Sequence, residues 1–533
     1  MADARGFVRG AVLLASAAAV SKLLGSVYTI VLQNVIGDRG MGLFQMAYPV
    51  YATLVAVATA GLPVALSKMV SERLALGDVY GGERVFRVAL VMLLACGVAA
   101  FALLFFGAGM WARLAGDPAA ALAVRAVAPA LLLVPAMSAL RGYYQGYQWM
   151  EPTAASQVVE QFVRVATILL LAMGLLSLGY STPVAAAGAA FGAVTGAAAG
   201  LLWLLRCWGS RPRPAAAKRA DAPGWLAMSR QLVYYAFPIS LGALVVPLMN
   251  NIDVITVVNL LKAAGHAQAE ATTTFGLLSG RAAKLMMLPT TLASSIGMAV
   301  MPAVSEAFTL GYRSQLSGRI DTALRLTVML ALPASAGLAI LARPIDITLF
   351  RDDAGWDLIA VTAVATVFAG VQLTTAAVLQ GAGWVYVPVA NLFFACAVKL
   401  AANLAWVKMY GAVGAAWATV VCYAVAAALN LWCLRRGLGE RIRWQAWFGK
   451  PLLATFIMSA VAYAMLRQWM WWGGAGAPRW AVAGSTAAMV VIAAGVYGLA
   501  LLATGTMTEK ELAALPRIGP RLAAWCARLG LVR

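Results

Sequence analysis

Fourteen long apolar runs constrain this chain more than any other feature of its sequence. A helix needs about 20 apolar residues to cross the roughly 30 Å of hydrocarbon in a bilayer. Runs of this length cover approximately residues 9–36, 43–67, 86–112, 119–145, 152–178, 182–206, 231–261, 274–303, 320–343, 356–382, 385–407, 411–434, 446–468 and 479–504. Because they lack the period-2 alternation of membrane barrel strands, they predict an all-α integral membrane protein with 14 transmembrane helices.

Composition excludes the soluble classes. Of the 533 residues, 62% are hydrophobic and 11% are charged, whereas a soluble protein has about 45–50% apolar and about 25% charged residues. Such a chain lacks the polar surface of a soluble enzyme, a secreted domain or a disordered protein. Six scattered cysteines without a CxxC pair, and the single His266, give no basis for a disulfide framework, a metal site or a cofactor.

The net charge is +20. The basic residues that produce it lie mostly between the apolar runs, which fits a membrane protein better than a nucleic-acid-binding protein. With the N-terminus inside, the inner segments hold 26 Lys and Arg residues and the outer loops hold eight. By the positive-inside rule, this bias predicts fourteen spans with both termini cytoplasmic.

Two parts of the chain resemble each other. Gln145-Gly146 recurs as Gln380-Gly381 at an offset of 235 residues, and Gly42-Leu43 recurs as Gly276-Leu277 at 234. This offset spans six helices, so both copies enter the membrane in the same sense. The pattern predicts two six-helix lobes in a parallel pseudo-two-fold repeat, followed by two C-terminal helices.

The predicted domains follow from this repeat and from the polar segments. They are an N-lobe at 1–206, a cytoplasmic linker at 207–229, a C-lobe at 230–436, the two further helices at 437–504, and a cytoplasmic amphipathic tail at 505–533.

Two helical lobes around an axis along the membrane normal are typical of an alternating-access transporter, with substrate near the midplane. Charged side chains inside the spans are therefore the informative ones, since each costs about 2.5–3.5 kcal/mol at a helix centre. We single out Lys22, Glu160, Arg164, Asp253, Arg281, Lys284 and Lys399.

Each of these charges has a structural and a functional interpretation. Glu160 and Arg164, four residues apart, form either a structural ion pair or a gated pair in a cavity. Asp253 binds a coupling cation or caps a neighbouring helix. The four lysines and arginines without a nearby acid either reach an interface or make a cleft positive, which suits an anion.

Other functions find less support in the sequence. No GxxxxGK[ST] loop is present, so transport would use an ion gradient, the membrane potential or the substrate gradient. A cation-coupled drug exporter needs acids in its cleft, and few are available. A membrane-embedded glycan enzyme would have to use Asp352-Asp353, in an outer loop too short for a sugar-nucleotide domain.

Three stretches resemble a known family. SKLLGSVYTIVLQNVIGDRGMGLFQMAYPVYATLVAVATAGLPVALSKMVSE at 21–72, ALRGYYQGYQWMEPTAASQVVEQFVRV at 139–165 and KLMMLPTTLASSIGMAVMPAVSEAF at 284–308 are similar to the multidrug/oligosaccharidyl-lipid/polysaccharide flippase superfamily. Within it, they look like the stage V sporulation protein B branch of polysaccharide biosynthesis proteins, which includes MurJ-type lipid II flippases.

This resemblance implies two six-helix lobes, a lipid-tail groove formed by the two extra helices, and an undecaprenyl-pyrophosphate-linked sugar as substrate. Lys22 and Lys284 match basic cavity positions of MurJ-type members, although Tyr28 stands where those carry a second arginine. Asp253 and Asn403 match a sodium site of some relatives, where Val407 replaces an expected acid.

We therefore expect a flippase of the bacterial plasma membrane, not an enzyme, that moves lipid II from the inner to the outer leaflet. Lys22 and Lys284, helped by Arg281 and Lys399, would bind the pyrophosphate. Expected partners are membrane lipids, a monovalent coupling cation, and the cell-wall synthesis or sporulation machinery. The alternative cargo is another polysaccharide-lipid intermediate, for the spore cortex or a surface polysaccharide.

Overall fold

A computed structural model describes residues 2–59, 61–210, 224–438 and 445–506. These residues form helices and turns without any β-strand, which confirms the predicted all-α class. The predicted amphipathic tail and most of the predicted linker lie outside the described residues.

The chain divides into two compact units, the first unit at Met1–Gly280 and the second unit at Arg281–Arg533. The helices of the first unit are α1 (Ala2–Thr59), α2 (Leu62–Ala75), α3 (Val79–Leu114), η1 (Pro118–Ala120), α4 (Ala121–Val127), α5 (Ala130–Gly146), α6 (Glu151–Ser177), α7 (Thr182–Cys207), η2 (Trp208–Ser210), α8 (Trp225–Ala263), α9 (Gln268–Gly276) and the start of η3 (Leu277–Ala282). Those of the second unit are α10 (Ala283–Thr309), α11 (Arg313–Ile340), α12 (Ala342–Phe350), α13 (Trp356–Gly381), α14 (Tyr386–Gly437), η4 (Gln445–Gly449), α15 (Lys450–Trp471), η5 (Gly474–Gly476) and α16 (Arg479–Ala503).

Twelve helical stretches among the described residues are long and apolar enough to cross a membrane. Two of them, Leu24–Ala75 and Tyr386–Gly437, each cover two of the predicted runs. Helix α1 contains the non-helical Gly37 with φ 71°, and helix α14 contains the non-helical Gly411 with φ 60°. Glycine adopts such backbone without strain. One kink directly follows the predicted run 9–36, and the other is at the first residue of the predicted run 411–434. The predicted number of fourteen crossings stays a prediction.

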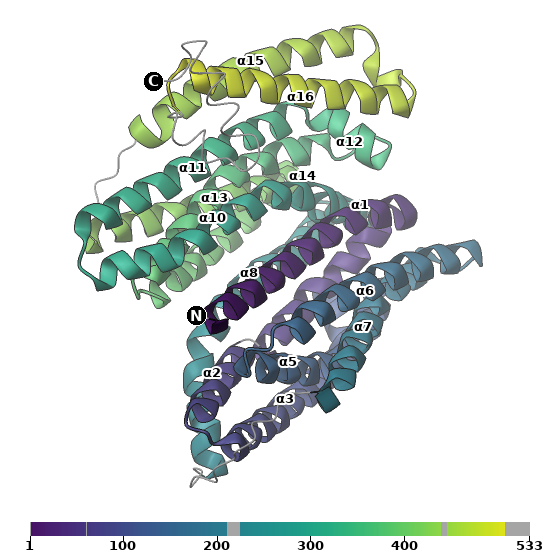
Figure 1. Cartoon of the computed structure of the whole chain (residues 1–533). Helices are drawn as coiled ribbons and strands as arrows, with labels where there is room; N and C mark the ends of the chain where they lie inside the picture. The colour runs from purple at the N-terminus through teal and green to yellow at the C-terminus, as the bar shows by residue number, and fades with distance from the viewer. Residues whose placement is uncertain (1, 60, 211–223, 439–444, 507–533) are drawn as a thin grey trace. The chain divides into compact units, whose positions relative to one another are not determined.

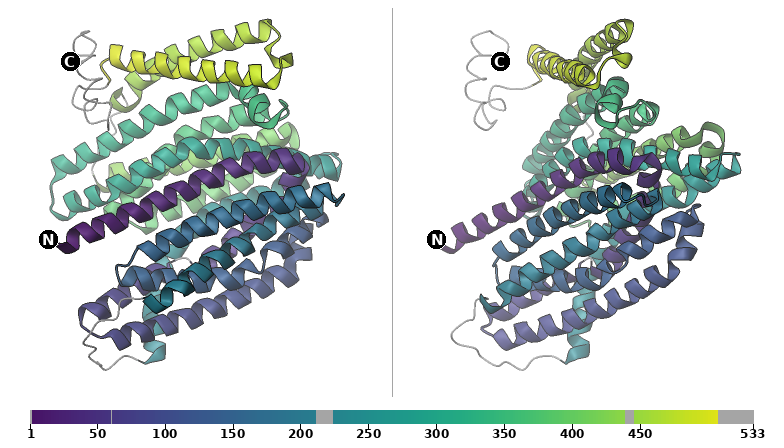
Figure 2. Two further views of the ribbon diagram at one scale, coloured as in Figure 1. Left: turned by 45° about the vertical axis from the view of Figure 1, so that its right-hand side comes forward. Right: turned by 90° about the vertical axis from the view of Figure 1, so that its right-hand side faces the viewer.

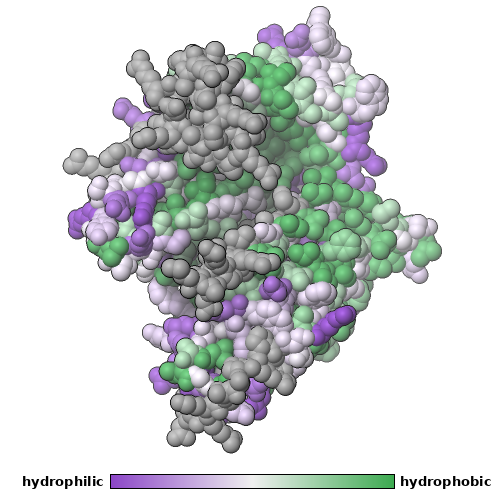
Figure 3. Space-filling view, in the orientation of Figure 1, coloured by the Kyte–Doolittle hydropathy of each residue, from purple (hydrophilic) through white to green (hydrophobic). Residues whose placement is uncertain are grey.

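Apolar side chains cover the helices as they do in a membrane protein. Phe106, Leu170, Phe456 and Trp480 are each at least 70% exposed on their helices. Figure 3 shows broad apolar areas on the face it presents, with hydrophilic residues gathered in separate patches. A lipid environment covers this surface at no cost, because acyl chains are as apolar as the side chains themselves.

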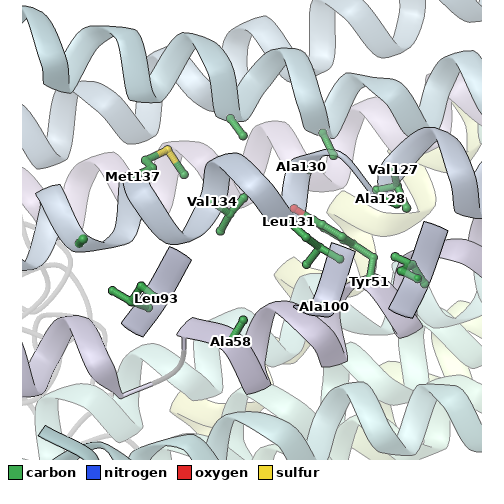
Figure 4. Packing of buried hydrophobic residues seen from close by; sticks show 14 of the residues in the cluster. Tyr51, Ala58, Leu93, Ala100, Val127, Ala128, Ala130, Leu131, Val134 and Met137 are labelled. Atoms are coloured by element: carbon green, nitrogen blue, oxygen red, sulfur yellow. The ribbon is translucent and has the colours of Figure 1, made fainter. Parts of the chain in front are cut away.

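The interior of the first unit is built mainly from small and branched apolar residues. Figure 4 shows Leu93, Ala100, Leu131 and Val134 meeting between α3 and α5, with Tyr51 of α1 beside them. Gly97 of α3 allows this close approach, since a Cβ there would lie 2.6 Å from the carbonyl oxygen of Leu131. Small residues at such crossings let membrane helices pack backbone to backbone.

The units do not coincide with the two predicted lobes. Figures 1 and 2 show α8 among the helices of the first unit, and Asn251 of α8 donates to the Thr53 hydroxyl of α1 at 2.7 Å. Lys262 donates to the carbonyl of Gly116 at 2.9 Å. The first unit therefore extends through α8 and α9, beyond the predicted N-lobe, and the division into six-helix lobes stays a prediction.

A contact inside the first unit carries the symmetry of the predicted repeat. A Cβ on Gly42 would lie 2.3 Å from the Thr272 carbonyl oxygen, and one on Gly276 would lie 1.9 Å from the Asp38 carbonyl oxygen. Adding 234 to the numbers of Asp38 and Gly42 gives Thr272 and Gly276, so each contact is the counterpart of the other in the predicted repeat. Gln45 donates to the carbonyl of Ser279, also 234 residues away, at 2.9 Å. Such reciprocal contacts are what a two-fold axis between α1 and α9 produces.

Gly37→Ala tests the kink in α1. A Cβ at this position meets no atom within 4 Å, so the left-handed backbone alone should destabilise the variant, by about 1–2 kcal/mol. Thermal unfolding of the purified protein in detergent should show a lower Tm.

The matched control is Gly495→Ala, at an exposed helical position of α16 where a Cβ also meets nothing within 4 Å. Its backbone is helical, so alanine should raise stability by about 0.5–1 kcal/mol. Equal effects of the two substitutions would contradict the kink.

Candidate functional site

Glu160 of α6 holds two arginines in the first unit. Its Oε2 accepts from Arg141 Nη2 at 2.8 Å, and its Oε1 pairs with the guanidinium of Arg164. Arg141 Nε also donates to the Ser156 hydroxyl at 3.0 Å. One carboxylate between two guanidiniums leaves this cluster with one uncompensated positive charge.

Glycines of α7 set the position of this cluster. A Cβ on Gly196 would lie 2.8 Å from the Glu160 carbonyl oxygen, and one on Gly192 would lie 3.0 Å from that of Arg164. Gly200 continues the row against Ser156 and Glu160. This small-xxx-small pattern brings the backbone of α7 against α6 and fixes the direction in which Glu160 and Arg164 project.

A small cavity adjoins the guanidinium of Arg164. Tyr28, Phe44 and Tyr48 of α1 line it, together with alanines of α7. The Nε of Arg164 is buried and has no hydrogen-bond partner among the described residues. A buried donor without a partner costs about 1–3 kcal/mol, so Arg164 keeps unused capacity to bind a negative group or water.

The segment of α1 around Lys22 runs beside this cluster. The Ser21 hydroxyl lies 3.5 Å from the Gln157 carbonyl oxygen, and a Cβ on Gly25 would lie 3.5 Å from Gln161 Nε2. The side chain of Lys22 lies outside the described residues. Its backbone nevertheless places it next to the stretch of α6 that carries Glu160.

Lys284 of α10 carries a charge without a counterpart. Lys284 is the second residue of α10, and its side chain is half-buried, whereas the next residue, Leu285, is buried. Among the described residues, no hydrogen bond or ion pair joins its ammonium group. A solitary lysine within a membrane span is rare and expensive, so a transported or bound anion is the partner that such a position favours.

Arg281 differs from Lys284, although both were expected to bind substrate. Its buried guanidinium donates to Asp346 Oδ1 at 3.0 Å and to Asp352 at 2.6 and 3.1 Å, and it lies 4.9 Å from the ring centroid of Phe350. Two carboxylates more than neutralise its charge. A substrate anion would have to displace one of them.

The two carboxyls on Arg281 differ in environment. Asp346 is fully buried outside the membrane spans, and this burial raises its pKa to about 6, although Arg281 and the Gly355 amide favour ionisation. Asp352 is half exposed. Desolvation acts to raise its pKa, but the hydrogen bonds from Arg281 and the Ala354 amide, together with the charge of Arg281, outweigh desolvation and lower the pKa. A single guanidinium thus holds one readily ionised and one reluctantly ionised carboxylate.

The remaining candidates lie in separate elements. Lys399 and Asn403 are both buried, one turn apart on α14 in the second unit. Asp253 is half-buried on α8 in the first unit. A coupling-cation site from Asp253 and Asn403 remains a prediction. Among the described residues, no group of three His, Cys, Asp or Glu side chains could hold a metal ion.

Two residues of these clusters escaped prediction. In the sequence, Arg141 lies near the inner end of its apolar run, which places it among the cytoplasmic cations, but its side chain binds Glu160. Asp346 lies in a short helix outside the predicted spans and was not singled out. The neighbouring acids Asp352 and Asp353 contact different arginines: Asp352 binds Arg281, and Asp353 accepts from Arg343 Nε at 2.8 Å.

Comparisons with known proteins identify relatives over the whole chain. Residues 7–308 match the family described as "Polysaccharide biosynthesis protein". Three proteins of Bacillus subtilis are similar. "Uncharacterized membrane protein YabM" is 31% identical over 98% of this chain and 96% of its own. "Lipid II flippase MurJ" is 30% identical over 81% and 83%. "Stage V sporulation protein B" is 28% identical over 96% and 98%.

Solved structures share the fold. A lipid II flippase MurJ in an inward closed conformation superposes with a TM-score of 0.69 at 14% identity, over 92% of this chain and 98% of that one. An inward-facing multidrug resistance MATE family transporter of the MOP superfamily gives 0.66 at 17% identity, over 79% and 94%. At these identities the likeness shows the fold and leaves the cargo open.

Glu160→Gln tests the bridging role of the carboxylate. Removing its charge leaves two partly buried guanidiniums without a counterion, which should lower the free energy of unfolding by about 3 kcal/mol. The double variant Glu160→Gln/Arg164→Met should regain part of this loss. Chemical unfolding in detergent micelles measures both.

The exposed pair of Lys68 and Glu72, at 3.8 Å, supplies the control. Glu72→Gln should change stability by less than about 1 kcal/mol, because water already solvates both groups. A Glu160→Gln effect as small as that of Glu72→Gln would show that the cluster does not contribute to folding.

Asp346→Asn tests the buried carboxyl through the pH dependence of Tm. A carboxyl with a raised pKa binds its proton more tightly in the folded state. Its contribution to stability therefore falls as pH rises from the ordinary value of 3.8 to about 6. The Tm of the wild type relative to Asp346→Asn should fall over this range and level off above about pH 7. A relative Tm that rises with pH would show that the ion pair with Arg281 dominates.

Proposed function

Because the chain belongs to the polysaccharide biosynthesis protein family, we propose that it is a flippase for a lipid-linked glycan precursor, and that this precursor is lipid II. The name of the relative that is 30% identical, a lipid II flippase, supports this cargo. One relative is named a flippase and one structure of the same fold is named a transporter, and the proposed activity involves no covalent chemistry.

The half-buried, solitary ammonium group of Lys284 carries this proposal. The pyrophosphate of a lipid-linked sugar bears at least two negative charges and cannot cross hydrocarbon unaided. A lysine supplies a compact positive charge with three donors, which replaces part of the hydration shell of a phosphate. Binding the anion also removes the cost of the unpaired lysine, so both partners gain from the contact.

The first unit would contribute positive charge from two sources. Lys22 lies on the stretch of α1 beside the Glu160 cluster, and that cluster retains one positive charge of its own. In the proposed cycle, the pyrophosphate enters from the cytoplasmic leaflet and binds Lys22 and Lys284, with Lys399 in support. A change between inward-open and outward-open states then exposes it outside, while the prenyl chain stays in lipid.

Arg281 contributes less in this scheme than the sequence suggests, because Asp346 and Asp352 already bind it. A charge that is already paired inside the protein also argues against a drug-cation exporter. Glu160 is the strongest acid candidate of the first unit, and two guanidiniums occupy both of its oxygens. An organic cation would have to compete with both.

Lys284→Ala and Lys22→Ala should each reduce translocation of fluorescent lipid II by about tenfold or more, since a desolvated charge pair is worth at least 1.4 kcal/mol. The assay uses proteoliposomes and measures how much labelled headgroup becomes accessible to a quencher. Lys284→Arg should retain part of the rate, because it keeps the charge.

Lys408→Ala is the matched control, because Lys408 is an exposed lysine on α14. Its rate should equal that of the wild type. Full activity of both Lys22→Ala and Lys284→Ala would overturn the assigned roles. If the wild type translocates an undecaprenyl-linked surface polysaccharide as fast as lipid II, lipid II is not the specific cargo, although the protein is still a flippase.

A further inference from the structure

The turn after α3 and the α8–α9 hairpin, which are far apart in the sequence, meet in the first unit. The first is the turn at 115–117, before η1, and the hairpin has its own turn at 264–267. In the predicted topology both turns are on the outer side, because the runs at 86–112 and 231–261 both cross the membrane from inside to outside. One turn belongs to the predicted N-lobe and the other to the predicted C-lobe, so the contacts between these segments cross the predicted lobe boundary.

Asp117 is the centre of these contacts. Its Oδ1 accepts from Gln268 Nε2 at 2.9 Å, and its Oδ2 accepts from the Thr272 hydroxyl at 2.8 Å. The Ala119 amide also donates to Oδ1, at 3.0 Å. The carboxylate is fully buried. A buried carboxylate is stable only when its oxygens are hydrogen-bonded, and α9 supplies two of these three donors through Gln268 and Thr272.

The end of α8 holds the backbone of the same turn. Asn259 Nδ2 donates to the Leu114 carbonyl at 2.7 Å, and Lys262 Nζ donates to the Gly116 carbonyl at 2.9 Å. Gly116 has φ 92°, and a Cβ there would lie 2.8 Å from Val258 Cγ1. The backbone of the turn therefore packs directly on α8, which fixes the direction in which the next side chain projects.

The predicted repeat gives Asp117 a counterpart in the second unit. Adding 235 to its number gives Asp352, and each aspartate accepts from the amide two residues further on, Ala119 in one case and Ala354 in the other. Asp352 accepts from Arg281 at 2.6 Å, within the predicted C-lobe. The two equivalent carboxylates thus differ, because Asp117 takes its donors from across the predicted lobe boundary.

A carboxylate that is enclosed by donors from a neighbouring helix has two stable environments. It is stable while Gln268 and Thr272 bind it, and it is stable when water replaces both of them. A carboxylate that has lost these donors without gaining water is strongly unfavourable. The contact of Asp117 with α9 therefore has two states, formed and hydrated, as a switch between two conformations needs.

We propose that Asp117, Gln268 and Thr272 form an outer latch, which keeps the outer ends of the two predicted lobes together while cargo enters from the inner side. The latch opens when the cleft turns outward, since alternating access separates the lobes on the side that opens. Asn259 and Lys262 are positioning residues, because they hold the turn on which Asp117 lies. This inference rests on the alternating access of the proposed function, and Asp117 itself does not bind the cargo.

The first experiment measures the separation of the outer ends. The six cysteines are replaced, and spin labels are attached at exposed Leu178, in the turn after α6, and at exposed Ala264, in the turn after α8. Pulsed electron spin resonance in lipid nanodiscs gives the distance distribution between the labels, without and with lipid II. The latch predicts that the shorter distance dominates in wild-type protein without cargo.

The test variants weaken the latch from both sides. Thr272→Val and Gln268→Met each remove one donor of α9, singly and together, while Asp117→Asn removes the charge and keeps an acceptor for the Ala119 amide. The double variant and Asp117→Asn should each raise the ratio of longer to shorter distances by about tenfold, because hydrogen bonds to a charged group are the strong ones. Wild-type distance distributions in both would overturn the proposal.

Two controls accompany these variants. Thr273→Val removes a neighbouring hydroxyl of α9, which donates to the Ala269 carbonyl of its own helix at 2.8 Å. Asp352→Asn changes the repeat counterpart of Asp117. Both should keep the wild-type distribution, and a control that lengthens the distance as much as the double variant would contradict the latch. Tm values identify any variant that does not fold, and Gln268→Met, at an exposed residue, then still tests the latch.

A second experiment locks the latch, which distinguishes a gate from a static contact. The variant Asp117→Cys/Thr272→Cys, without the native cysteines, is bridged by a short bifunctional methanethiosulfonate. The bridged protein should translocate fluorescent lipid II in proteoliposomes about tenfold or more slowly than the same protein after reduction. Bridging Arg343→Cys/Asp353→Cys, at an exposed ion pair of 2.7 Å within the predicted C-lobe, should leave the rate unchanged. A bridged latch with an undiminished rate would show that this contact does not open during transport.

The two proposals fail in different ways. If wild-type proteoliposomes do not translocate lipid II, the proposed cargo is wrong, but the distance distributions without cargo still test the latch. If the wild type translocates lipid II, and neither the variants nor the bridge has an effect, the latch is wrong and the flippase stands.

Discussion

The cost of a charge in hydrocarbon determines how this molecule can be organised. Each ionised group within a span must find an opposite charge, a hydrated space or a ligand. The described residues divide accordingly. Glu160 is enclosed by Arg141 and Arg164, and Arg281 is enclosed by two aspartates. Lys284 has no such partner, which makes it the position where a negatively charged cargo gains most.

Paired charges and the solitary lysine serve different ends. The Glu160 cluster ties α5 to α6, and the glycine row of α7 holds it in place. The ion pairs of Arg281 tie η3, directly before α10, to α12 and to the turn that follows α12. Lys284 follows Arg281 by three residues, and the backbone of α1 at Lys22 runs beside the Glu160 cluster.

The sequence predicted the helices well because apolar length is a local property. Spans need about 20 apolar residues, and the chain shows them plainly. The two kinks were also visible as breaks between runs near Gly37 and Gly411. Partners across helices were not visible, since Arg141 and Glu160 are 19 residues apart and Arg281 and Asp346 are 65 apart. The division into units likewise depends on contacts of α8 and α9 that no local pattern reveals.

The central claim is that the Lys284 ammonium group binds the phosphates of a lipid-linked substrate. An experimental structure of the protein in nanodiscs, with lipid II bound, tests it most directly. The claim predicts a phosphate oxygen within about 3 Å of Lys284 Nζ, the distance of a charge-assisted hydrogen bond. A pyrophosphate bound elsewhere, with Lys284 facing acyl chains or a newly recruited carboxylate, would contradict it.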